Sequence, residues 1–164
     1  MKMPGHSPAW ALAKGDIMTF EGGPYIQAAC FCEIALQDKE SVLSLIRIID
    51  TLNTNAAGPN PPEDMPPVTY TMKLVLMLKS GKARGRYNLK LIPQLPDGST
   101  KDAKVMTVHF EGEEKGHNVI MNMAFTFEIE GLYWFNIYLD DDKLTAIPFR
   151  VKYNRVVTTS AMPR

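Results

Sequence analysis

Residues 125–151 read FTFEIEGLYWFNIYLDDDKLTAIPFRV and carry the clearest pattern in this chain of 164 residues. Apolar side chains occupy alternate positions on both sides of Gly131, which is typical of β-strands. They are Phe125, Phe127 and Ile129 before the glycine, and Tyr133, Phe135, Ile137 and Leu139 after it. Three aspartates at 140–142 close the second strand, and the alternation resumes at Ile147, Phe149 and Val151. The segment predicts two strands joined at a corner, then a hairpin and a third strand.

The corner itself, residues 130–135, has the form of the tyrosine corner of immunoglobulin-like sandwiches. In that motif a tyrosine at the start of a strand turns its hydroxyl back onto the backbone upstream. Tyr133 would take this role, with Phe135 as the core residue two positions later. Antibody domains have a cysteine there, so a disulfide between sheets is excluded at Phe135. The alternative is that Gly131 merely makes a turn and Tyr133 is an ordinary strand aromatic.

The same period of two recurs on the N-terminal side of this segment. It predicts strands at 25–34, 42–52, 70–78, 87–91 and 106–110, and another at 119–129. The spacing at 42–52 also permits a helix from Lys39, but the crowded β-branched residues favour a strand. We therefore expect an all-β fold, an immunoglobulin-like or C2-like antiparallel β-sandwich of about eight strands.

The segment 53–67, NTNAAGPNPPEDMPP, contains five prolines. Proline cannot donate to a strand ladder, so this segment is predicted to be a loop that crosses between the sheets. An alternative is that it forms a polyproline ligand for another protein. The predicted organisation is an N-terminal arm over 1–24 with a short helix from Pro8 to Lys14, a sandwich over 25–153 and a flexible tail over 154–164.

Composition excludes several classes of function. Eighteen basic and eighteen acidic residues give a formal net charge of zero, so no global field draws the protein to nucleic acid or to an acidic membrane. The N-terminus has no apolar signal region, and we expect a cytoplasmic protein. The motifs of serine hydrolases, P-loop enzymes, zinc proteases and dinucleotide-binding proteins are missing, which predicts no catalytic residues and no cofactor.

Cys30 and Cys32 lie two residues apart on the first predicted strand. Both sulfurs therefore point to one face, too far splayed for a relaxed mutual disulfide. That face also contains Ile26, Ala28 and Ile34 and is predicted to be the buried one. The cysteines are expected to be reduced, buried and unreactive.

Two arrangements could bind metal, and neither is favoured. His109 and His117 could meet across a hairpin and ligate an ion together with Glu111. The three aspartates at 140–142 resemble a calcium loop, but consecutive residues at a hairpin tip cannot all point at one ion. We therefore expect no metal site.

The order of the connections between strands places opposite charges at one end of the predicted sandwich. If successive strands run antiparallel, the connections at 37–40, 79–86, 111–115 and 140–143 share one end. The second connection carries Lys82, Arg84 and Arg86, and the last carries Asp140, Asp141 and Asp142. This mixed-charge end is the candidate binding surface. Solvated hairpin tips with no binding role are the alternative.

The chain resembles a family of uncharacterised bacterial β-sandwich proteins. The similarity spans residues 28–151 and rests on AACFCEIALQDKESVLSLIRIIDTL, on LPDGS and on EGLYWFNIYLDDDKLTAIPFRV. It implies a sandwich fold and a bacterial or phage origin, but no activity, and it implies a glycine at the position of Arg47. We expect a non-catalytic module that binds a protein partner or copies of itself, and neither nucleic acid nor membrane. The alternatives are an enzyme with an unrecognised active site and a calcium-dependent C2-like membrane-binding domain.

Overall fold

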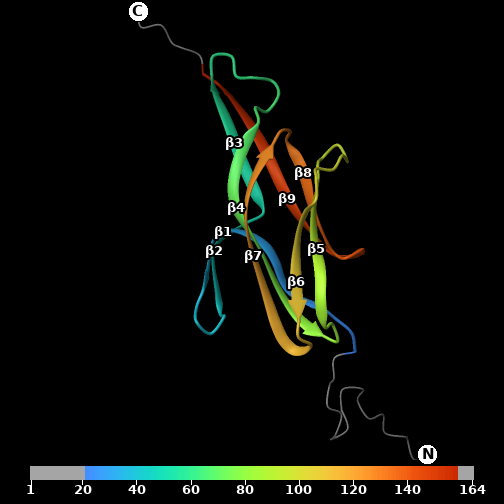
Figure 1. Ribbon diagram of the computed structural model, residues 1–164. Coiled ribbons are helices and arrows are strands. Elements are labelled where there is room, and N and C mark those ends of the chain that lie inside the picture. Colours follow the sequence, from blue (N-terminus) through green and yellow to red (C-terminus); the bar gives the residue numbers. More distant parts are fainter. Residues whose placement is uncertain (1–20, 159–164) are drawn as a thin grey trace, which may run out of the picture.

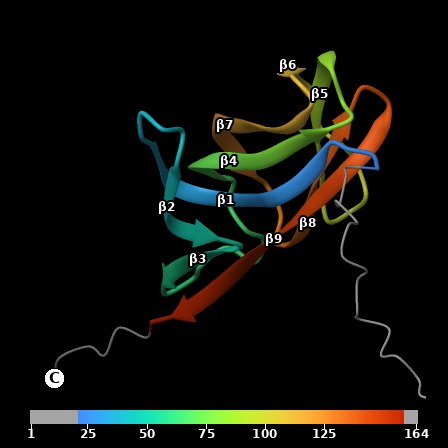
Figure 2. The same cartoon turned by 90° about the horizontal axis from the view of Figure 1, so that it is seen from below.

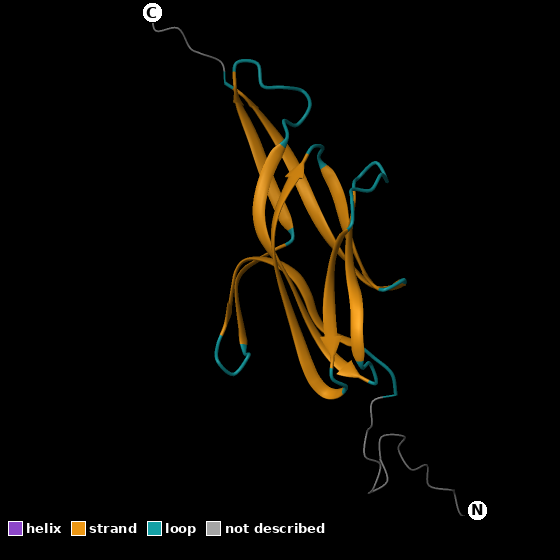
Figure 3. Cartoon of the chain, viewed as in Figure 1, coloured by secondary structure: helices purple, strands orange, loops and turns teal. Residues whose placement is uncertain are grey.

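The computed structural model describes residues 21–158. All of the regular structure in this part is strand, as Figure 3 shows, so it has no helix that is long and apolar enough to cross a membrane. The predicted helix from Pro8 to Lys14 lies outside the described residues. The nine strands are β1 (Tyr25–Gln37), β2 (Leu43–Ile49), β3 (Thr51–Gly58), β4 (Val68–Gly81), β5 (Gly85–Gln94), β6 (Lys104–Phe110), β7 (Glu113–Phe127), β8 (Gly131–Leu139) and β9 (Asp142–Val157).

The strands form two sheets that face each other (Figure 1). One sheet has the order β2-β1-β4-β7 and the other has the order β3-β9-β8-β5-β6. Inward side chains of both sheets make one core, in which Phe31, Phe127, Tyr133, Phe135 and Phe149 are completely buried. The predicted β-sandwich is confirmed. The count differs by one strand, and one pair, β3 with β9, is parallel rather than antiparallel.

The additional strand lies where the sequence predicts a loop from Asn53. The chain changes sheets at Asp50, whose carbonyl accepts a hydrogen bond from the Arg150 amide at 2.8 Å. From there residues 51–58 run parallel to residues 150–157 of β9. This ladder also extends β9 to Val157, whereas the sequence predicts a flexible tail from Asn154. The five prolines do lie in the loop that follows, at 59–67.

The tyrosine corner is confirmed. The Tyr133 hydroxyl donates to the Ile129 carbonyl at 2.8 Å and accepts from the Ile129 amide at 3.2 Å. Gly131 has φ 138°, and a Cβ at this position would lie 2.7 Å from Cβ of Pro96. The corner therefore requires both the tyrosine and the glycine.

The predicted inward face of β1 is wrong. The pairing of β1 with β4 shifts register between Ile26 and Ala28, and this bulge exchanges the faces of the residues that follow. Phe31 enters the core, while Cys30 and Cys32 lie on the opposite face. Cys32 is nevertheless completely buried and Cys30 is half-buried. Burial was predicted for both thiols, and the structure confirms it for Cys32 but not for Cys30, which stays partly exposed.

Arg47 occupies a backbone conformation that favours glycine, with φ 55°. Its side chain pairs with Glu33, with 3.0 Å between Nε and Oε2. Glu33 also accepts a hydrogen bond from the Tyr70 hydroxyl at 3.0 Å. The positive φ explains why the family resemblance implies a glycine at this position. In this chain an arginine adopts that conformation, and its side chain forms an ion pair with Glu33.

Candidate functional site

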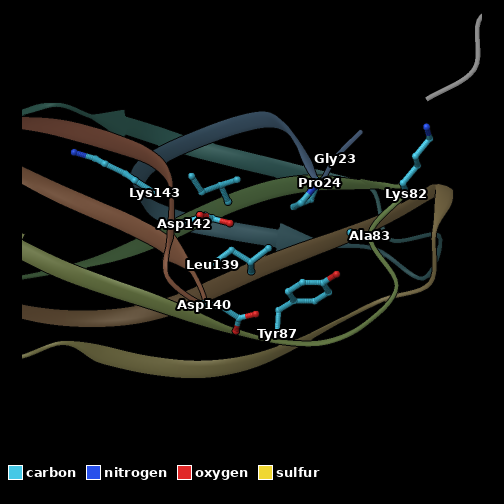
Figure 4. Close-up of a pocket in the computed structure, with 10 residues that line it drawn as sticks. Gly23, Pro24, Lys82, Ala83, Tyr87, Leu139, Asp140, Asp142 and Lys143 are labelled. Atoms are coloured by element: carbon cyan, nitrogen blue, oxygen red, sulfur yellow. The ribbon is translucent and has the colours of Figure 1, made fainter. Parts of the chain in front are cut away.

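A pocket of about 450 Å³ opens where the β4–β5 turn lies beside the β8–β9 hairpin (Figure 4). We refer to it as the end pocket. Its charged lining residues are Lys82, Asp140, Asp142 and Lys143, and its other lining residues are Gly23, Pro24, Ala83, Tyr87, Leu139 and Leu144. Figure 4 shows Lys82 and Lys143 projecting on opposite sides, with Leu139 and Asp142 between them. The end pocket thus combines an apolar interior with charges of both signs.

One wall of the end pocket is held by backbone contacts. The Lys82 amide donates to the Gly22 carbonyl at 2.9 Å, which joins the segment before β1 to the β4–β5 turn. Gly81 has φ 56°, and a Cβ there would lie 2.1 Å from the Gly22 oxygen. Only glycine permits this approach. The backbone of the turn that carries Lys82 is therefore held in place against Gly22.

Asp140 fixes the opposite wall. Its Oδ1 accepts a hydrogen bond from the Asn88 amide at 2.8 Å, and its own amide donates to the Asn88 carbonyl at 2.7 Å. Its φ is 52°, a conformation that aspartate tolerates better than most residues. Asp140 is therefore occupied in holding the β8–β9 hairpin against β5.

The other two aspartates differ in their surroundings. Asp141 has a side chain that is 98% exposed and pairs with Lys90 at 3.0 Å. Asp142 lies in the end pocket and is exposed. Within residues 21–158, neither Asp142 nor Lys82 makes a side-chain hydrogen bond or ion pair. These two opposite charges are free to meet a ligand.

The two predicted arginines lie elsewhere. Arg84 donates to the Glu111 carbonyl at 2.7 Å and pairs with Glu113 at 3.1 Å, so it ties the β4–β5 turn to the β6–β7 turn. Arg86 is exposed on β5, opposite His109 of β6. Of the six predicted site residues, the structure brings Lys82, Asp140 and Asp142 to one pocket. It places Arg84, Arg86 and Asp141 outside that pocket.

Sequence reasoning missed the apolar residues of the end pocket and Lys143. Tyr87, Leu139 and Leu144 belong to strands or to strand ends, where period two indicates only burial. Pro24 comes from the segment before β1, and no local signal places it beside β8 and β9. The predicted neighbour at 37–40 does not line the end pocket, because the β1–β2 hairpin turns away from it (Figure 2).

Metal ligands do not converge in the described part of the chain. No group of three or more histidine, cysteine, aspartate or glutamate residues between 21 and 158 could hold an ion. The His117 ring instead packs against Phe110, with 6.0 Å between ring centroids.

The two facing sheets and the tyrosine corner define an immunoglobulin-like β-sandwich. Within that class, the chain belongs to DUF6941, a family of unknown function whose profile matches residues 27–152. This confirms the predicted membership of an uncharacterised family. None of the curated proteins compared with the chain matches it.

Among solved structures, the chain is similar to the CARDB domain of a protein from Pyrococcus furiosus, crystallised in complex with di-metal ions. The identity is 14%, over 85% of this chain and 97% of that one, with a TM-score of 0.38. A similarity this low carries no inference about the ligands of the present chain.

Proposed function

We propose that this protein is a non-catalytic binding module that takes up a segment of a partner protein in the end pocket. The observation that carries the proposal is the pair of uncommitted opposite charges, Lys82 and Asp142, in a pocket with the apolar side chains of Tyr87, Leu139 and Leu144. A complementary segment would place a carboxylate near Lys82 and a basic residue near Asp142. An apolar side chain between them would rest on Leu139 and Tyr87.

The mixed sign of the end pocket favours a protein ligand over nucleic acid. A phosphate that approached Lys82 would also meet the carboxylates of Asp140 and Asp142, which repel it. A protein segment with charges of both signs gains orientation and specificity from the same arrangement. Lys143 adds a second cation, so the end pocket is balanced rather than basic.

The walls of the end pocket are held before any ligand arrives. The Gly22–Lys82 and Asp140–Asn88 hydrogen bonds fix the two elements that carry the charges. Binding by a preorganised surface costs less conformational entropy than binding by a mobile loop. A short segment of the partner can therefore bind without the rest of the partner protein.

The test uses a displayed library of short random peptides, selected on the immobilised full chain. We expect the enriched peptides to carry an acidic and a basic residue on either side of an apolar one. Their affinity, measured by fluorescence anisotropy, should fall by about tenfold in Lys82→Glu and at high salt. The matched control is Lys152→Glu, which reverses an exposed lysine opposite Asn53 in β3 and should leave affinity unchanged.

The double variant Lys82→Glu, Asp142→Lys keeps the net charge and exchanges the two signs. It should lose the peptides of the parent and select peptides with the reverse order of charges. Equal binding of the enriched peptides to the parent and to Lys82→Glu contradicts the proposal. Tight binding of a random oligonucleotide at physiological salt contradicts it as well.

A further inference from the structure

The β1–β2 hairpin exposes a concentration of large apolar side chains. The exposed fractions are 44% for Ile34, 55% for Leu36, 58% for Val42, 43% for Ile46 and 63% for Ile48. Ile34 lies directly opposite Ile46, so these two side chains share one face of the hairpin. Figure 2 shows β2 at one side of the molecule, as the outermost strand of its sheet. Contiguous apolar surface of this kind on a folded protein marks an interaction site.

Strand β2 is also an edge of its sheet. In the order β2-β1-β4-β7 it has a described neighbour on one side only, which leaves a row of backbone donors and acceptors on the other. Proteins usually protect such edges with lysine or proline. β2 has neither, and its one charged residue, Arg47, is paired with Glu33. The opposite edge, β7, begins with Glu113, Glu114 and Lys115.

The hairpin is held in place from several sides. Asp38 Oδ1 accepts hydrogen bonds from the amides of Glu40 and Val42, both at 2.9 Å, which fixes the hairpin tip. Asn118 of β7 donates to the Ser41 carbonyl at 3.0 Å and anchors the tip to its own sheet. The apolar surface is therefore presented on an ordered element, and docking on it requires little further ordering.

We propose that β2 pairs antiparallel with β2 of a second copy of this chain. The two four-stranded sheets then become one continuous sheet across a twofold axis. The same face of both hairpins, with Ile34, Ile46 and Ile48, lines the junction. The pairing is self-complementary, because a twofold axis beside the middle of β2 places the apolar strip of one copy next to the same strip of the other.

The exposed apolar area of the hairpin approaches what a small dimer interface needs. Five side chains that are about half exposed present on the order of 300 Å² of apolar surface per copy. Partly exposed Leu43, Leu45 and Ile49, together with the edge backbone, extend this toward the roughly 600 Å² per copy at the lower limit of specific interfaces. Charge does not oppose the association, since the chain has a net charge of zero and Glu33 neutralises Arg47.

The test is sedimentation velocity of the full chain over a range of concentrations, combined with amide hydrogen exchange. We expect a dimer that persists at high salt, with slow exchange of the β2 amides that point away from β1. Ile46→Lys should weaken the dimer by about a hundredfold or more and make these outward amides exchange quickly. Ile46 is partly exposed, so this variant should retain the circular dichroism spectrum of the parent.

Val105→Lys is the matched control, because Val105 is 58% exposed on another edge strand, β6. It should leave the dimer intact, as should Lys82→Glu in the end pocket. Loss of the dimer in Ile46→Lys and loss of peptide binding in Lys82→Glu are therefore separate results, so the dimer and the proposed function can fail independently. A parent that stays monomeric overturns the inference. So does a dimer that survives Ile46→Lys or leaves the outward β2 amides unprotected, because such a dimer forms through another surface.

Discussion

Asp140 and Asn88 exchange two hydrogen bonds, one from the Asn88 amide to Asp140 Oδ1 at 2.8 Å and one from the Asp140 amide to the Asn88 carbonyl at 2.7 Å. The pair joins the β8–β9 hairpin to β5 at the rim of the end pocket. Of three consecutive aspartates, the one in the left-handed conformation has this structural role, while Asp142 remains free for a ligand.

Asp140→Ala should destabilise the fold by about 1 kcal/mol, because the Asn88 amide loses its acceptor and alanine tolerates positive φ poorly. Asp140→Asn keeps an acceptor and should cost clearly less. Asp141→Ala removes an ion pair whose carboxylate is 98% exposed and should cost well under 1 kcal/mol. Urea unfolding followed by circular dichroism measures all three. A larger loss for Asp141→Ala than for Asp140→Ala would show that the roles are reversed.

Tyr133→Phe should cost about 1–3 kcal/mol. The hydroxyl makes two hydrogen bonds with the Ile129 backbone in a position that is completely buried, and phenylalanine leaves both backbone groups without this partner. Tyr138→Phe on the same strand is the control, since Tyr138 is half-exposed and its hydroxyl makes no bond within the described residues. Equal losses of thermal stability for the two variants would show that the hydrogen bonds of the tyrosine corner do not stabilise the fold.

Burial raises the pKa of both thiols. At Cys30 the neighbouring Cys32 adds to the effect, whereas at Cys32 the charge of Lys73 opposes it. Titration with a thiol reagent at mildly alkaline pH should be slow in the native protein, slower for Cys32 than for Cys30, and fast in denaturant. Rapid native modification of Cys32 contradicts the burial described here.

The same shift predicts a dependence of stability on pH. A thiol whose pKa is higher in the folded state contributes stability that is complete below the unfolded pKa and is lost as the pH rises through the folded value. The parent should therefore lose stability above about pH 9 more steeply than the double variant Cys30→Ala, Cys32→Ala. If the free energies of unfolding of the parent and the double variant, measured by denaturant titration, fall in parallel with rising pH, the thiols do not cause the loss of stability.

Millimolar calcium should not change the melting temperature. The Asp140 carboxylate accepts the Asn88 amide and Asp141 pairs with Lys90, so the aspartates do not converge on one point. Differential scanning fluorimetry checks this directly. A rise of several degrees that Asp141→Asn abolishes would establish a calcium site.

Strands with apolar alternation could be predicted from the sequence, because each such segment buries one face locally. Residues 131–139 and their tyrosine corner are the clearest case. Strand β3 could not be predicted, because TLNTNAAG has little apolar alternation and forms a strand through its parallel ladder with residues 150–157, far away in the chain. The inward face of β1 was missed for a related reason, since one bulge after Ile26 reverses the parity of the rest.

The candidate site was only partly predictable. Strand parity says which connections lie at one end, but not how far apart they are. The β4–β5 turn crosses between the sheets, whereas the β8–β9 hairpin stays within one sheet. Lys82 and Asp142, one from each of these connections, both line the end pocket, whereas Arg84 pairs with Glu113.

Amide NMR of the full chain, titrated with a peptide from the selection proposed here, tests directly whether the end pocket binds protein segments. We expect saturable shifts at the end pocket, at the amides of Lys82, Ala83, Leu139 and Leu144, and their loss in Lys82→Glu. We expect little change on the β1–β2 hairpin, which we propose pairs with a second copy. Shifts confined to other surfaces, or equal shifts in Lys82→Glu, would contradict the assignment of the end pocket as the protein-binding site.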